Sequence, residues 1–127
     1  KLQLAGVDFE VIDRGESYDL AIPSMNVVYT HMLGKTTHSI LTSAAHIEAF
    51  LQMLKEYQAA GYAMILTSHS GPEGQDAVAG KISYLNKTKE IMQQSKTADE
   101  FKAAMQAAFP AYDGLNYLDM TAGFLYK

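Results

Sequence analysis

Two of the four histidines of this chain directly follow apolar segments that are typical of buried β-strands. His31 comes after residues 27–30, and His69 comes just after residues 63–66. Neighbouring strands that each carry an imidazole at the carboxyl end place both rings at one edge of the sheet, where open α/β sheets bind their ligands. We therefore expect His31 and His69 to lie together at a ligand site. The alternative is that each is an ordinary surface histidine.

Other side chains near these segments are candidates for the same site. His38 lies in the loop after His31, although a structural role in that loop is the alternative, and Asp13 and Glu16 are candidate carboxylates from an earlier polar loop. We expect His46 to face solvent, because it lies off the apolar stripe of its helix. The chain has no G-x-S-x-G elbow, Walker loop or G-x-G-x-x-G motif, so neither a serine triad nor a phosphate-binding loop is indicated.

The chemistry that this histidine pair favours is metal binding. Two imidazoles are the beginning of a zinc site or another divalent-metal site, which His38 or Asp13 would complete. A stable structural zinc site has four ligands with supporting hydrogen bonds. We therefore expect the 127-residue chain alone to be metal-free as purified, or to bind metal weakly.

The elements that must position these residues follow from the hydrophobic pattern. Alternating residues over 2–11 predict a β-hairpin, and residues 20–22, 27–30 and 63–67 predict further strands. Helices are predicted by apolar stripes and by a capping box at Thr97 and Glu100, with Pro110 ending one helix and residues 115–125 forming the last. The stripes consist of Ile47, Phe50, Leu51, Leu54 and Tyr57, then Val78, Ile82, Leu85 and Met92, then Phe101, Met105 and Phe109. The order of strands and helices predicts an α/β or α+β layered fold.

Composition limits the classes of function. The length of 127 residues and the 48% hydrophobic content suit one globular domain, and the absence of cysteine excludes disulfides, thiolate zinc sites and cysteine nucleophiles while leaving the compartment undetermined. A net charge of −4 without a basic run predicts no nucleic-acid partner, and the short apolar runs predict no membrane segment. Because the chain opens at Lys1, we expect that an upstream piece was removed.

Three segments together resemble the carboxy-terminal half of the metallo-β-lactamase fold: "AIPSMNVVYTHM", the helix "HIEAFLQMLKEYQAAGY", and "MILTSHSGPEG". The resemblance covers roughly residues 1–95. It implies half of an αββα sandwich, with one mixed sheet and helices on one face. Residues 96–127 are then a helical extension packed on this half.

The family's metal ligands carry over only in part. His69, followed by Gly71-Pro72, matches the last metal-binding histidine, although Ser68 replaces the usual glycine before it. His31 stands where the family has its bridging aspartate. The loop over residues 13–16 has no histidine where the family has its middle ligand. The family's H-x-H-x-D-H motif does not occur in the chain, so we expect it to be encoded upstream.

The resemblance implies a metal-dependent hydrolase that acts on a small-molecule ester, lactone, amide or thioester, with zinc or another divalent metal as cofactor in the full-length parent. We expect this chain alone to be inactive and to self-associate, most simply as a dimer, because half a sandwich exposes an apolar sheet face. Two alternatives are a non-catalytic binding or scaffolding protein of the same fold, and an independent small α/β module.

Overall fold

The first half of the chain builds one mixed β-sheet. The computed structural model describes residues 2–15 and 17–127, and within them five strands pair in the order β1-β2-β3-β4-β5. Their bounds are Leu2–Leu4, Val7–Asp13, Tyr18–Ile22, Val27–Tyr29 and Met64–Leu66. Strands β1 to β4 are antiparallel, whereas β4 and β5 are parallel, as a β–α–β connection requires. The predicted α+β class with a mixed sheet is confirmed.

Tight turns connect the antiparallel strands. Ala5 and Gly6 join β1 to β2, and both have positive φ angles, of 52° and 80°. Such a pair of left-handed residues matches the twist of a two-residue hairpin. A short 3₁₀ helix, η1 (Pro23–Met25), joins β3 to β4, and Asn26 ends it with a φ of 57°. The polar and glycine residues in the sequence therefore lie where the chain reverses.

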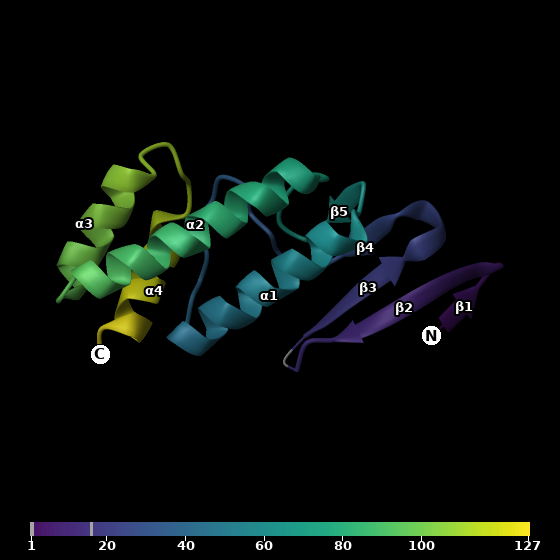
Figure 1. Ribbon diagram of the computed structural model, residues 1–127, viewed down its shortest axis with the longest axis horizontal. Helices are drawn as coiled ribbons and strands as arrows, with labels where there is room; N and C mark the ends of the chain where they lie inside the picture. Colours follow the sequence, from purple (N-terminus) through teal and green to yellow (C-terminus); the bar gives the residue numbers. More distant parts are fainter. Residues whose placement is uncertain (1, 16) are drawn as a thin grey trace.

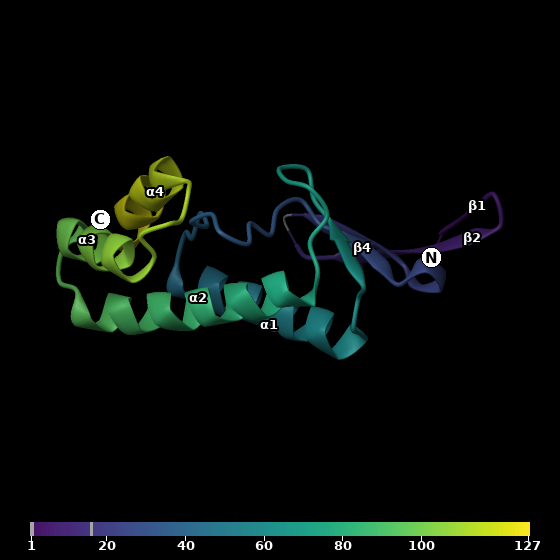
Figure 2. The ribbon, with the colours of Figure 1, turned by 90° about the horizontal axis from the view of Figure 1, so that it is seen from above.

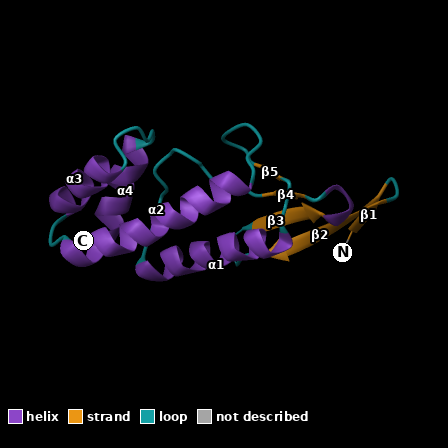
Figure 3. Ribbon diagram, turned by 45° about the horizontal axis from the view of Figure 1, so that its top comes forward, coloured by secondary structure: helices purple, strands orange, loops and turns teal. Residues whose placement is uncertain are grey.

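Four α-helices follow within the described residues, with the bounds Ala44–Ala60 (α1), Gln75–Gln94 (α2), Ala98–Ala108 (α3) and Leu115–Leu125 (α4). The Ser43 hydroxyl accepts the His46 backbone N–H at the start of α1, and the Thr97 hydroxyl accepts the Glu100 N–H at the start of α3. Helices α1 and α2 run side by side, while α3 and α4 pair at the end far from the sheet (Figures 1 and 3). None of these described helices combines the length and hydropathy of a bilayer-crossing segment.

A single hydrophobic core joins the sheet to all four helices. Its fully buried members are apolar side chains from the sheet, from α1 and α2, and from the carboxy-terminal helices. They include Ala21, Val28, Ile65, Ile47, Leu54, Leu85, Phe101, Met105 and Leu118. The predicted parts 1–95 and 96–127 therefore share one core. In α2 the buried stripe differs from the prediction, since Lys81, Tyr84 and Thr88 are buried whereas Ile82 and Met92 are only partly buried.

The face of the sheet that the helices leave uncovered is apolar. Helices α1 and α2 lie on one side of the sheet (Figure 2). Val11, Leu20 and Tyr29 are paired across β2, β3 and β4, so their side chains share the opposite face. Val11 is 46% exposed, Met64 41% and Tyr29 37%. An uncovered row of large apolar side chains is typical of a surface that meets another protein layer.

Candidate functional site

The parallel pairing of β4 and β5 brings His31 and His69 together. Val28 lies beside Ile65 in the ladder, and two further hydrogen bonds extend the pairing beyond the strand ends. Thr30 N–H donates to the Leu66 carbonyl at 2.9 Å, and Ser68 N–H donates to the His31 carbonyl at 3.0 Å. The histidines that follow each strand therefore leave the sheet at one edge, as the sequence predicts.

The two imidazole rings meet edge to face. Their Nε2 atoms are 3.0 Å apart, and the ring planes are inclined at 85°. The ring centroids are only 4.6 Å apart, so the two Nε2 atoms do not point straight at one another. Both side chains are exposed, which leaves the nitrogens accessible to a ligand.

The loop that carries His69 is held by polar contacts. Ile65 and Glu73 exchange backbone hydrogen bonds of 2.8 and 2.9 Å, which closes the loop at its base. Within it, the hydroxyls of Thr67 and Ser70 are 3.0 Å apart, and the Tyr29 hydroxyl is hydrogen-bonded to the Ser68 hydroxyl. These contacts fix the approach of His69 to His31.

The histidine pair fits two positions of a divalent-metal site. Two nitrogens bound to one zinc ion at about 2.0–2.1 Å lie roughly 2.9–3.4 Å apart for angles of about 90–110° between them. The observed 3.0 Å falls in that range. Over residues 2–15 and 17–127, however, no group of three or more His, Asp or Glu side chains is assembled for a metal.

The other sequence candidates lie apart from this pair. Asp13 is exposed, and its carboxylate accepts the Gly15 backbone N–H at 2.8 Å. Glu16 lies outside the described residues. His38 is fully buried, and its Nδ1 is 2.8 Å from the Tyr84 hydroxyl. The structure thus brings together two of the four named candidates for metal binding, His31 and His69.

His38 belongs to an aromatic cluster in the interior. Its ring contacts Tyr84, Phe109 and Tyr112 at centroid distances of 5.7, 6.5 and 5.6 Å. Burial lowers the pKa of His38, and the nearby Lys81 ammonium lowers it further. Its Nε2 has no hydrogen-bond partner among the residues that the structure describes. A neutral, buried ring is the consequence.

A groove of about 750 Å³ extends from the histidine pair along α1. Its walls are the segment between β4 and α1, one side of α1, and a few side chains from three other regions. Those side chains are Arg14 and Ser17 between β2 and β3, His69 after β5, and Tyr117 of α4. This volume is within the range of about 300–1,000 Å³ that is typical of small-molecule sites.

Arg14 is the cationic side chain of this groove that could bind an anion, but two carboxylates already pair with it. Its Nε donates to Asp19 at 3.0 Å, and its Nη1 donates to Glu56 at 3.1 Å. Asp19 is buried and also accepts the Tyr57 hydroxyl, whose pKa is raised mainly by burial. The Arg14 contact to α1 therefore holds the β2–β3 turn against the helix.

Sequence reasoning missed two groove residues. His46, expected to face solvent, lines the groove, and its Nδ1 accepts the Thr42 backbone N–H at 3.1 Å. Arg14 was not a candidate either. A second stripe on α1, with helical spacing through Ala45, Ala49 and Met53, is the signal that could have placed His46 beside the groove.

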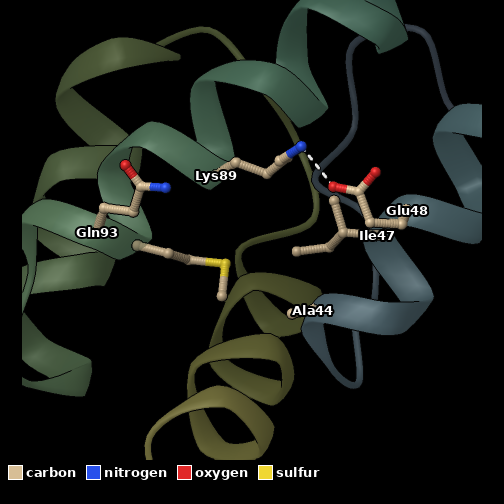
Figure 4. Close-up of a pocket in the computed structure, with 6 residues that line it drawn as sticks. Ala44, Ile47, Glu48, Lys89 and Gln93 are labelled. Carbon is tan, nitrogen blue, oxygen red and sulfur yellow. Dashed lines mark ion pairs between the residues drawn. The ribbon is translucent and has the colours of Figure 1, made fainter.

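A smaller pocket of about 260 Å³ lies between α1 and α2 (Figure 4). An ion pair between Lys89 and Glu48 crosses it, and Ile47 and Met92 supply apolar walls. Because neither histidine of the pair reaches it, the larger groove is the candidate site.

No family profile, curated protein or solved structure matches this chain.

Proposed function

We propose that His31 and His69 supply two ligands of a divalent-metal site, and that this chain is the carboxy-terminal half of a metallo-β-lactamase-like hydrolase. The 3.0 Å approach of their Nε2 atoms at the edge of a parallel strand pair carries the proposal. The remaining ligands come from a segment outside this chain. A cation held there would act as a Lewis acid and lower the pKa of a bound water to roughly 7, which ester, lactone, amide or thioester hydrolysis needs.

The residues of this chain have two tasks in such a site. The β4–β5 ladder and the Ile65–Glu73 hydrogen bonds hold the two imidazoles at a fixed separation. The groove beside them accommodates a small-molecule substrate and shields it from water on one side.

The uncovered sheet face supports the half-sandwich part of the proposal. Val11, Tyr29 and Met64 are all more than one-third exposed on a sheet whose other face is packed against helices. A second sheet laid over these side chains would bury them, and in its absence a second copy of the chain would do so.

The test is a calorimetric titration with zinc chloride. We expect the wild-type chain to bind one zinc ion weakly, and both His31→Ala and His69→Ala to abolish that binding. His46→Ala, a histidine of the same groove, is the matched control and keeps the wild-type affinity. Equal zinc binding by the wild type and the two pair variants would refute the metal site.

One observation favours a second candidate function. A distance of 3.0 Å also suits an N–H···N hydrogen bond between two neutral imidazoles. If the chain binds no zinc, this hydrogen bond is the only role of the pair. The chain would then be a non-catalytic binding or scaffolding protein of the same fold.

A further inference from the structure

We propose that the groove binds an uncharged acyl or aryl carbonyl compound, with its apolar body along α1 and its carbonyl oxygen accepting a hydrogen bond from His46. This inference rests on the proposed function and deepens it, since the same groove contains His31 and His69. Three independent features of the groove lead to it: the surface of α1, the pairing of the charges, and the tautomer of His46.

The first feature is a second apolar stripe on α1. Ala45, Ala49, Phe50 and Met53 line the groove, and their spacing places them on one face of the helix. This face is separate from the buried residues Ile47, Leu51 and Leu54, which pack into the core. The small side chains of Ala45 and Ala49 are exposed and leave room for a ligand against the helix.

The second feature is that the part of the groove along α1 offers a ligand no unpaired charged side chain among the described residues. Both Asp19 and Glu56 accept hydrogen bonds from the Arg14 guanidinium, so Arg14 is not available to a carboxylate or a phosphate. Among the described residues, no Asp or Glu lines the groove to pair with a cation. Away from the histidine pair, a charged ligand would lose its hydration along α1 without gaining a partner, so this part of the groove favours an uncharged one.

The third feature is the hydrogen-bonding state of His46. Because its Nδ1 accepts the Thr42 N–H, the neutral ring carries its proton on Nε2. Over the described parts of the chain, Nε2 makes no hydrogen bond. The ring is stacked near Phe50, with the planes inclined at 21°. The Nε2–H of His46 is thus a donor held beside an apolar wall, and it suits a carbonyl oxygen, which is an uncharged acceptor.

The experiment is a fluorescence titration of the metal-free chain with 6-propionyl-2-(dimethylamino)naphthalene. This probe is an uncharged aryl ketone whose emission shifts to shorter wavelength in apolar surroundings. We expect saturable binding by the wild type. Ala49→Glu should weaken it at least about tenfold, because a carboxylate in the groove must stay hydrated and so excludes the apolar probe. His46→Phe, which removes the donor and keeps a ring, should weaken it by roughly three- to tenfold.

Two matched variants locate the probe. Ala59→Glu makes the same substitution at an exposed position of α1 that does not line the groove, and we expect wild-type binding. Val11→Glu places the charge on the uncovered sheet face, and binding should again be retained. If Val11→Glu loses the probe and Ala49→Glu does not, the probe binds the sheet and the inference is overturned.

The outcome for the groove can be separated from the outcome for the metal. If the wild type binds zinc but Ala49→Glu and Ala59→Glu bind the probe with equal affinity, the groove inference alone is refuted. If Ala49→Glu weakens probe binding and Ala59→Glu does not, but the wild type binds no zinc, the metal site alone is refuted.

Discussion

The buried Lys81 makes the stability of this protein increase as the pH rises from 7 to 9. Its side chain is fully buried, and its Nζ donates hydrogen bonds to the Thr37 carbonyl at 2.8 Å and the Ser39 hydroxyl at 2.9 Å. It also lies 4.3 Å from the centre of the Tyr84 ring. Burial lowers the pKa of Lys81 from 10.5 to about 7. The folded chain therefore releases this proton at a pH where the unfolded chain still binds it.

The sign and the size of the effect follow from proton linkage. Between pH 7 and pH 9 the unfolded state binds more protons than the folded state, so the free energy of unfolding rises with pH. A folded pKa of about 7 against an unfolded value of 10.5 gives a gain of about 2 kcal/mol over this interval.

Urea unfolding at pH 7, 8 and 9 measures this gain, and Lys81→Met should remove it. His38 does not produce the same slope, since its pKa is lowered and its ring is already neutral over this range. A wild-type stability that is flat or falls from pH 7 to pH 9 would refute the reasoning. So would an equal slope in Lys81→Met.

The remaining predictions concern stability and self-association. Asp19→Ala should lower the free energy of unfolding by about 2–3 kcal/mol in urea, because it removes the acceptor of the part-buried Arg14 Nε and of the buried Tyr57 hydroxyl. Gly114→Ala should lower it by about 1–3 kcal/mol, because Gly114 has a φ of 78°; Gly80→Ala in open space on α2 should instead raise it by about 0.5–1 kcal/mol. Light scattering should detect self-association of the wild type that Val11→Lys weakens, and a wild-type monomer at high concentration would contradict this.

Local patterns in the sequence predicted the elements well. The hairpin predicted over residues 2–11, the helix that carries the stripe from Ile47 to Tyr57, and the last helix at Leu115–Leu125 all lie where periodicity placed them. Each depends on residues a few positions apart. The approach of His31 to His69 also follows from a simple rule, because parallel neighbouring strands end at one edge of a sheet.

The rest of the site depends on contacts between distant residues. Arg14 is paired with Glu56, 42 residues later, and His38 with Tyr84, 46 residues later. No periodicity in either segment encodes such a partner. The same holds for the burial of Lys81: its spacing from Val78 and Leu85 places it on the buried face of α2, but its acceptors, Thr37 and Ser39, are more than 40 residues away.

Hydrogen bonds between the β4–α1 segment and the carboxy-terminal part of the chain determine when the groove can form during synthesis. The Thr121 hydroxyl accepts the Leu41 N–H at 2.8 Å and donates to the Ser39 carbonyl at 2.9 Å, and the His38 N–H donates to the Asp113 carbonyl. One wall of the groove is thus tied to residues made about 80 positions later. A nascent chain can form the hairpins and α1 early, but this wall stays untied until α4 has left the ribosome. The groove is therefore among the last parts of the molecule to form.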